Sequence, residues 1–282
     1  MAKAVELPGE NRHDSTALGR GFRRRIEAGD LLLGGMIMQL LDPAIVKLYS
    51  YAGFDFIYMD NEHVLMAGTS SMASFVMAAR DNGLPVIAKC PELARPEVAR
   101  LLEAGVSGIQ LPRTESRQDM ATLVDFVKFP PVGSRAAAPL FGNVDYAWPS
   151  DIEQWLVDTN AATFIVAHIE TRKGLENIDE IVSTPGVDML YIGPLDFAIS
   201  MGRPNDPDHP EVIDAMQRVL AACVKNNVVF GTTCRGPAMA GQWVAKGARF
   251  FEVVDELSLI AKGAGEFVDA YRQSAAPVED AV

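Results

Sequence analysis

Residues 51–63 read YAGFDFIYMDNEH and contain, in order, a helix end, a turn, a buried strand and a polar strand end. The pair Ala52-Gly53 places a glycine where a helix C-cap requires positive φ. The apolar run 55–60 begins two residues later and gives way to Asp60-Asn61-Glu62-His63. A short apolar run with such boundaries is typical of a strand in a parallel sheet.

This pattern recurs along the chain, with glycine again closing helical segments at Gly83, Gly105 and Gly247. The eight apolar runs that we expect to be strands are 31–39, 55–60, 84–89, 107–111, 163–170, 188–192, 228–232 and 249–253. Segments of helical period lie between them, at 43–52, 72–81, 96–104, 116–127, 175–182, 211–225 and 237–245. Eight strands that alternate with helices predict a closed (β/α)8 TIM barrel, and the absence of a GxGxxG motif after the first strand gives a dinucleotide fold no support.

The composition fits a single folded unit. Of 282 residues, 49% are apolar and 22% charged, which excludes a mainly disordered chain. We expect an N-terminal extension and first helix over 1–28, one barrel domain over 29–275 and a flexible tail over 276–282. The stretch 129–148 is rich in Pro, Gly and aromatic residues, and we expect it to form a long structured loop after the fourth strand.

Charge and cysteine content restrict the partners and the compartment. The formal net charge is −12, and a field of that sign repels nucleic-acid phosphates and anionic lipid surfaces. The three cysteines form no CxxC pair, which favours a reducing compartment. The richest apolar run, 31–41, is shorter than the roughly 18 residues of a membrane span. We therefore expect a soluble, cytoplasmic protein with neither nucleic-acid nor membrane partners.

Polar residues gather where the predicted strands end. The second strand ends in Asp60-Asn61-Glu62-His63, the third in Lys89, and the fifth in His168-Ile169-Glu170. Gly193-Pro194-Leu195-Asp196 follows the sixth strand. Because barrel enzymes build their sites at the carboxyl ends of the strands, we expect these side chains to meet at one mouth.

Two of these acids are candidates for a metal site. Side chains alternate along a strand, so His168 and Glu170 project to the same side. Glu170 and Asp196 come from neighbouring strands and can share one divalent cation through oxygen ligands, as Mg²⁺ prefers. Two protein carboxylates would leave coordination positions open for water or substrate.

Four motifs together resemble the HpcH/HpaI aldolase family. They are residues 52–63, the loop 129–135 (FPPVGSR), residues 169–171 (IET) and residues 192–196 (IGPLD), and the likeness runs in order from about residue 33 to the last helix. The resemblance implies a class II aldolase that uses Mg²⁺ or Mn²⁺. Such an enzyme reversibly cleaves a 4-hydroxy-2-oxo acid to pyruvate and an aldehyde. It also implies a hexamer, a dimer of trimers in which the last helix is exchanged between subunits.

The resemblance implies roles for individual residues. The catalytic residues are His63 as the base, Asp60 beside it, Glu103 as the acid that raises the basicity of His63, and Lys89 in place of a transition-state arginine. The metal ligands are Glu170 and Asp196. The substrate-binding residues are His168 at a glutamine position, Leu195 through its backbone N–H, Asp196, and Arg135, for which bracing of the loop is an equal alternative.

The departures from the family pattern leave alternatives open. Lys89 keeps the charge of the arginine but loses its planar fork. His168 can contact substrate, serve as a third metal ligand that shifts preference toward Mn²⁺, Co²⁺ or Zn²⁺, or be a hydrogen-bonded core histidine. Leu195 replaces a small alanine and narrows the pocket. The alternative functions are an oxaloacetate-type 2-oxo acid decarboxylase of the same family and a barrel that binds a 2-oxo acid without turnover.

Overall fold

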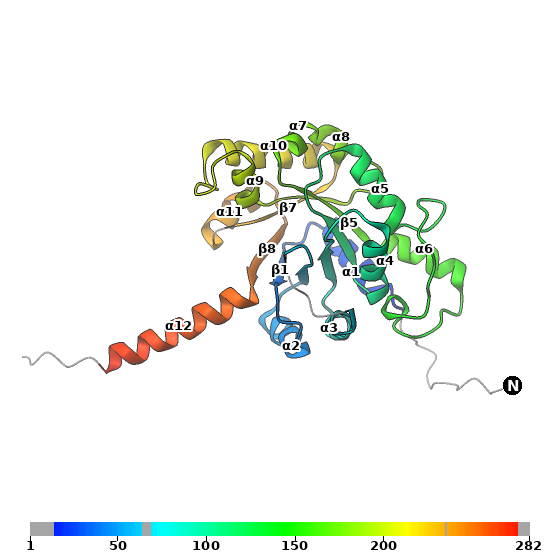
Figure 1. The fold of residues 1–282 in the computed structure, drawn as a ribbon, viewed down its shortest axis with the longest axis horizontal. Helices are drawn as coiled ribbons and strands as arrows, with labels where there is room; N and C mark the ends of the chain where they lie inside the picture. Colours follow the sequence, from blue (N-terminus) through cyan, green and yellow to red (C-terminus); the bar gives the residue numbers. More distant parts are fainter. Residues whose placement is uncertain (1–13, 64–68, 235, 276–282) are drawn as a thin grey trace, which may run out of the picture.

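A computed structural model describes residues 14–63, 69–234 and 236–275. Eight parallel strands close into one barrel in sequence order, with helices outside it (Figure 1). The strands are β1 (Leu32–Ile37), β2 (Phe56–Asp60), β3 (Val86–Lys89), β4 (Gly108–Leu111), β5 (Phe164–Ile169), β6 (Met189–Ile192), β7 (Val229–Thr233) and β8 (Phe250–Asp255). The predicted (β/α)8 barrel is confirmed, and each predicted strand overlaps an observed one.

Twelve α-helices and one short 3-10 helix connect the strands in the part of the chain that the structure describes. The helices are α1 (Ala17–Glu27), α2 (Pro43–Ala52), α3 (Thr69–Asp81), α4 (Arg95–Ala104), α5 (Arg117–Val127), η1 (Gly142–Val144), α6 (Ile152–Ala162), α7 (Arg172–Glu176), α8 (Ile178–Val182), α9 (Pro194–Ser200), α10 (Pro210–Asn226), α11 (Pro237–Ala245) and α12 (Glu256–Ser274). The predicted bounds of α2 and α11 are confirmed to the residue.

Local chemistry explains why α2 begins and ends where predicted. The Asp42 side chain accepts a hydrogen bond from the Ala44 N–H at 2.8 Å, which caps the amino end of the helix. Pro43 takes the first helical position, where its missing N–H costs nothing. Gly53 follows the last turn at φ 88°, a left-handed conformation that favours glycine.

The lower interior of the barrel is apolar and closely packed. The ring of Phe56 stacks on that of Phe250 with 4.3 Å between centroids. A Cβ at Gly34 would overlap the Phe56 ring, so the absence of a side chain there leaves room for the aromatic layer. Each buried aromatic side chain contributes about 1.5–3 kcal/mol of hydrophobic stabilisation. This layer supports the polar residues that lie above it at the strand carboxyl ends.

Two predicted elements differ in the structure. The single helix predicted over 175–182 is divided into α7 and α8, because Asn177 between them leaves the helical region at φ −95° and ψ 16°. The loop 129–148 does not follow β4 directly. It connects α5 to α6, and it packs against the ends of helices that lead into strands: Gly142 lies against the Ala104 carbonyl at the end of α4, and the Phe129 N–H donates to Asn160 Oδ1 near the end of α6 at 2.7 Å. This loop therefore lies toward the amino ends of the strands.

The last helix, α12, points away from the barrel (Figure 1). Of its side chains only Glu256 is buried, and its carboxylate accepts hydrogen bonds from the backbone N–H groups of Met38, Gln39 and Leu40 at 2.7–3.0 Å. Residues 1–13 and the predicted tail 276–282 lie outside the described residues. None of the helices described combines the length and the apolar character that a membrane crossing requires.

Candidate functional site

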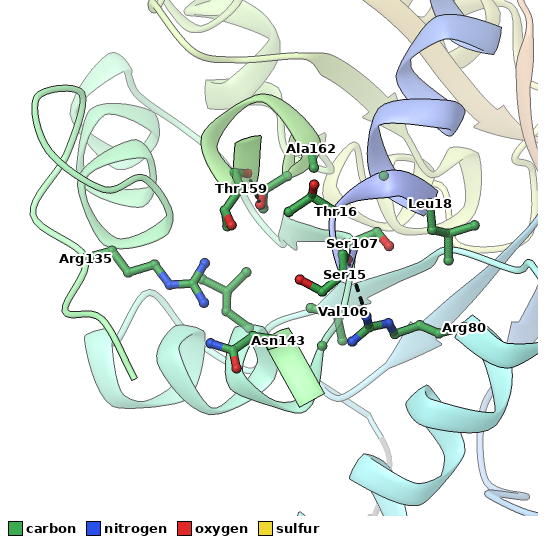
Figure 2. A pocket seen from close by; sticks show the side chains of 14 residues that line it. Ser15, Thr16, Leu18, Arg80, Val106, Ser107, Arg135, Asn143, Thr159 and Ala162 are labelled. Carbon is green, nitrogen blue, oxygen red and sulfur yellow. Dashed lines mark hydrogen bonds between the residues drawn. The ribbon is translucent and has the colours of Figure 1, made fainter. Parts of the chain in front are cut away.

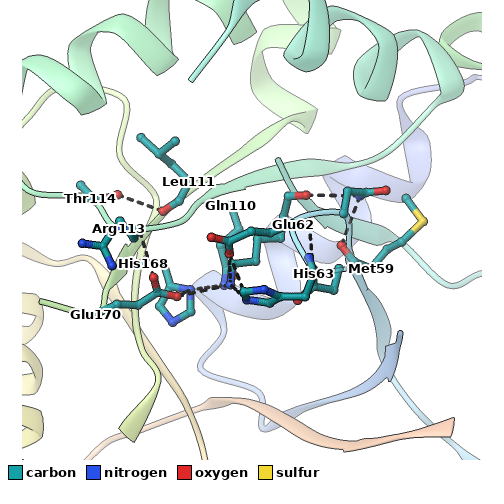
Figure 3. A network of polar contacts seen from close by, with 12 residues as sticks. Met59, Glu62, His63, Gln110, Leu111, Arg113, Thr114, His168 and Glu170 are labelled. Carbon is teal, nitrogen blue, oxygen red and sulfur yellow. Dashed lines mark hydrogen bonds and ion pairs between the residues drawn. The ribbon is translucent and has the colours of Figure 1, made fainter. Parts of the chain in front are cut away.

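The mouth of the barrel carries a row of buried polar side chains. Strand register aligns Asp60 of β2 with Lys89 of β3, and Lys89 with Gln110 of β4. These three side chains and that of His168 on β5 are all buried. Successive residues on a strand point to opposite sides, so this row lies on the inner face directly above the aromatic layer. Figure 3 shows Gln110 and His168 of this row together with Glu170, and Glu62 and His63 from the loop after β2.

Lys89 lies at the centre of this network. Its Nζ is 2.5 Å from Glu62 Oε2, 3.3 Å from Glu170 Oε1 and 3.4 Å from His63 Nε2. The Lys89 side chain is only 3% exposed. Burial by itself would lower the pKa of Lys89, but the charges of Glu170 and Glu62 outweigh it and raise this pKa. The mouth therefore contains a fixed positive charge.

His63 is presented to solvent by a turn that Asp60 organises. One carboxylate oxygen of Asp60 accepts hydrogen bonds from the backbone N–H of Glu62 at 2.8 Å and of His63 at 2.9 Å. The His63 side chain is 57% exposed, and its Nε2 lies 3.3 Å from Glu62 Oε2. Asp60 thus positions the histidine through the backbone, while Glu62 contacts the imidazole directly.

Glu170 is held as an ionised carboxylate. Its Oε1 lies 2.7 Å from His168 Nδ1, and its Oε2 accepts the Arg113 backbone N–H at 3.1 Å. Burial by itself would raise the pKa of Glu170, but the hydrogen bond and charge of His168, with Lys89 and Arg113, lower it to about 2. The carboxylate therefore remains charged and available as a ligand at neutral pH.

The contacts of His168 determine which nitrogen can bind a further group. Because the Glu170 carboxylate can only accept, His168 Nδ1 donates to it, and in the uncharged form of the ring Nε2 would present a lone pair. That Nε2 is buried and has no hydrogen-bond partner among the described residues. A Cβ at Gly193 would lie 2.9 Å from Nε2 and 3.8 Å from Asp196 Oδ2. Glycine at 193 therefore keeps open the space between His168 and Asp196.

The donor set fits a divalent cation with open positions. Asp196 and Leu195 are exposed in the first turn of α9, directly after β6. Glu170 is a buried, ionised carboxylate, and the buried atom beside it without a partner is His168 Nε2, which faces Asp196 across Gly193. Across residues 14–63, 69–234 and 236–275, however, no three His, Cys, Asp or Glu side chains are grouped as a metal cage. The structure therefore does not assemble His168 with Glu170 and Asp196 as a third ligand.

Two predicted site residues do not reach the mouth within one chain. Glu103 is in the last turn of α4, which runs antiparallel to the strands and ends beside the start of β4. Its charge acts on Arg135. The expected pair of His63 with Glu103 is therefore not formed within one chain. Arg135 is buried beside the Phe129 ring at 4.6 Å, so in this chain it braces the loop, which was the alternative to binding substrate at the mouth.

Two buried polar residues, Gln110 and Glu252, were not identified from the sequence, and Glu62 was predicted to lie at the mouth without a role of its own. Gln110 Nε2 lies 3.1 Å from His168 Nδ1, and Glu62 contacts both Lys89 and His63. Deeper in the barrel, Glu252 of β8 is buried and hydrogen-bonded to Tyr191, whose ring packs edge-on against His168 at 4.7 Å. Burial raises the pKa of Glu252 to about 8 despite that hydrogen bond. A polar residue at an inward position of a buried strand is the signal that would have identified both Gln110 and Glu252.

Comparison with known proteins gives a consistent result. The family model for HpcH/HpaI aldolase/citrate lyase matches residues 34–262. A 5-keto-4-deoxy-D-glucarate aldolase from Salmonella arizonae is 26% identical, covering 83% of this chain and 90% of the relative. A hydroxypyruvate/pyruvate aldolase from Paraburkholderia phytofirmans is 28% identical over 84% of this chain and 91% of its own. The crystal structure of an HpcH/HpaI aldolase from Desulfitobacterium hafniense superposes with a TM-score of 0.84 at 27% identity, covering 89% of this chain and 96% of that one.

Proposed function

This chain belongs to the HpcH/HpaI aldolase/citrate lyase family, and we propose that it is a class II aldolase that cleaves a 4-hydroxy-2-oxo acid to pyruvate and an aldehyde. The observation that carries the proposal is the convergence of Glu62, His63 and Glu170 on the buried ammonium of Lys89, at 2.5–3.4 Å. The relatives named as aldolases support the same reaction class, a carbon–carbon lyase.

His63 is the group best placed to move the proton of the substrate. Its imidazole is exposed at the mouth, and its backbone is fixed by Asp60. In the cleavage direction, a base removes the proton of the 4-hydroxyl and the C3–C4 bond breaks. The 4-hydroxyl carbon becomes the aldehyde, and the electron pair passes to the pyruvate fragment as an enolate. A neutral imidazole is the usual base for such a step near neutral pH.

Lys89 stabilises the charge that develops on the pyruvate fragment. Its ammonium is buried and already oriented by Glu62 and Glu170, so little reorganisation is required when the enolate forms. The backbone N–H of Leu195 donates to an oxygen of the 2-oxo acid, and His168 contacts the substrate through its unpaired Nε2. The exposed Leu195 side chain lies at the rim, where it limits the size of the aldehyde.

Glu170 and Asp196 would hold a divalent cation, which supplies Lewis-acid stabilisation of the enolate when bound. Two carboxylate oxygens with positions left for water or substrate suit Mg²⁺ or Mn²⁺. If His168 Nε2 moved in as a third ligand, it would widen the range of accepted ions to Co²⁺ and Zn²⁺. The buried, ionised carboxylate of Glu170 supports this assignment.

We further propose a homohexamer in the cytoplasm. The exposed apolar side chains of α12, among them Phe267 and Tyr271 at 72% and 75% exposure, support its exchange onto a neighbouring subunit. The three cysteines are free, as expected in a reducing compartment. Light scattering coupled to size-exclusion chromatography tests the hexamer, because deletion of α12 would then leave a smaller assembly.

The reaction is tested by mixing the purified protein with pyruvate and a panel of short aldehydes, with Mg²⁺ or Mn²⁺. We expect aldol products, loss of activity with a chelator and recovery when the metal is restored. Oxaloacetate is supplied in a separate reaction. Rapid decarboxylation of oxaloacetate with no aldol product from any aldehyde would replace the proposal by a decarboxylase. Failure to exchange the pyruvate methyl protons with D₂O under any metal would indicate a binding protein.

A further inference from the structure

A polar pocket lies at the opposite end of the barrel from the mouth. It is bounded by the start of α1, the end of α4, the loop before α6 and the end of α6 (Figure 2). The pocket opens to solvent and has a cavity volume of about 40 Å³. Among the described residues that line it there are two arginines, Arg80 and Arg135, and no Asp or Glu. Figure 2 shows their guanidinium groups on opposite sides of the pocket.

Arg135 is buried without an acceptor for its guanidinium. The residue is 7% exposed and stacks on Phe129, and no hydrogen bond or ion pair of its guanidinium is found in the part of the chain that the structure describes. The charge of Glu103 acts on it only at a distance. Burial lowers the pKa of Arg135 to about 10 in spite of Glu103. Buried polar groups are normally paired, so a guanidinium without an acceptor is an exception that a bound anion would explain.

Arg80 contributes a second positive charge from α3. One of its nitrogens donates to the Ser15 backbone carbonyl at 3.3 Å. Another lies only 2.8 Å from the position that a Cβ at residue 105 would take, so a side chain there would displace the guanidinium from the pocket wall. Gly105 also has φ 98°, a conformation that favours glycine. Asp145 and Asp81 are the acids whose charges act on Arg80, and neither lines the pocket.

Further donors face the same space. The hydroxyl of Thr159 is buried and has no partner among the described residues, and Thr159 lines the pocket. Leu18 and Gly19, in the first turn of α1, also line it, and no acceptor for their backbone N–H groups is found within residues 14–63, 69–234 and 236–275. The start of an eleven-residue helix carries a partial positive charge that favours an anion.

We propose that this pocket binds a small tetrahedral oxyanion, of the class of inorganic phosphate and sulfate, between Arg80 and Arg135. Donors that enter from α1, α3, α6 and the loop before α6 suit an anion whose oxygens point in four directions. Guanidinium groups are the preferred partners of such anions because they donate several hydrogen bonds in a fixed plane. The site is separate from the mouth and does not depend on the proposed reaction.

Calorimetric titration of the full-length protein with inorganic phosphate tests the proposal, with ionic strength held constant by sodium chloride. We expect saturable binding, competition by sulfate, and no response to acetate. Arg135→Gln should weaken binding at least about tenfold, because a charge-assisted hydrogen bond is lost. Arg80→Gln should weaken phosphate binding by a similar factor. Arg80 is only partly buried, so this variant still tests the proposal if Arg135→Gln fails to fold.

Two control variants distinguish this pocket from other positive charges. Arg100→Gln removes the same charge from the exposed face of α4 and should bind phosphate like the unmodified protein. Lys89→Met removes the cation at the mouth and should also leave binding unchanged. Binding that survives both pocket variants, or that disappears with Lys89→Met, would overturn the proposal. A response to acetate equal to that to phosphate would exclude a tetrahedral oxyanion as the ligand.

Discussion

The two ends of this barrel bury positive charge in opposite ways. At the mouth, Lys89 is surrounded by Glu62 and Glu170, and its pKa is raised. At the amino end, burial lowers the pKa of Lys128 to about 8, partly offset by Asp188, and lowers that of Arg135 to about 10. Within the described residues, Lys128 donates to two neutral carbonyl oxygens, those of Asn160 and Thr163, at 2.7 and 2.6 Å.

This difference indicates what each end does. A cation whose charge is stabilised by carboxylates is a permanent part of the site and can act on substrate without first losing a proton. A cation without a carboxylate partner costs stability unless something else supplies the negative charge. The mouth is therefore organised for chemistry, whereas at the amino end Lys128 and Arg135 are buried without a carboxylate in contact among the described residues.

The largest effect should come from removing the carboxylate of Glu170. Glu170→Gln keeps the size of the side chain but removes the proposed metal ligand and a partner of Lys89. We expect kcat/KM for aldol cleavage to fall by about 10³-fold or more, since a Lewis acid contributes several kcal/mol. Glu176→Gln, on the exposed face of α7, is the matched control and should be neutral. Activity within threefold of the unmodified enzyme would exclude Glu170 as a ligand.

Replacing the cation at the mouth should have the next largest effect. Lys89→Met is expected to lower kcat by about 10²–10³-fold, the usual cost of one preorganised stabilising group. Lys89→Arg keeps the charge and should recover part of the loss. Steady-state kinetics with a fixed aldehyde measures both variants. If Lys89→Met changed KM alone, Lys89 would bind substrate without stabilising the transition state.

Glu252, between the aromatic layer and the mouth, should make stability depend on pH. Its pKa of about 8 in the folded protein lies above the ordinary 4.5, so the unfolded chain releases this proton first. This residue's contribution to stability is therefore greatest below pH 4.5 and is lost as pH rises toward 8. Because of this group, the unfolding free energy of the unmodified protein should fall by about 2.5 kcal/mol between pH 5 and pH 7. In Glu252→Gln this fall should be absent. Urea denaturation at both pH values measures it, and parallel pH profiles for the two proteins would contradict it.

Lys128 should give a smaller dependence of the opposite sign. Its pKa of about 8 in the folded protein lies below the ordinary 10.5, so the folded state releases its proton first. Stability from this residue therefore rises between pH 8 and pH 10, by about 2 kcal/mol. Lys128→Met should remove this rise, as measured by the difference in unfolding free energy between the two proteins. A difference that does not change over this pH range would show that Lys128 is not desolvated as described.

Much of the fold could be predicted because the chain repeats one local rule. A glycine at the end of a helix followed by a short apolar run identified β2, β3, β4 and β8, and Gly53 and Gly105 show the predicted positive φ. The strand-end residues Asp60, Lys89, His168 and Glu170 meet as expected, since parallel strands of a barrel end on the same side. The roles assigned to them remain predictions.

Glu103 and Arg135 show where motif matching was insufficient. Both lie in segments that resemble the family, but a motif does not specify at which end of the barrel a helix terminus lies within one chain. Glu252 and Gln110 were overlooked for another reason. Each is a single polar residue in an apolar run, and its importance depends on the side chains brought next to it by other strands.

The sequence alone determined the order of strands and helices, the family likeness and the residues at the strand ends, because these depend on local periodicity and on turn chemistry. Tertiary structure decided which charges are paired. Lys89 and Arg135 are both buried cations near strand ends, and only the closure of the barrel gives two carboxylates to the first and none to the second. Electrostatic contacts depend on distances between segments far apart in the chain, which local sequence patterns do not contain.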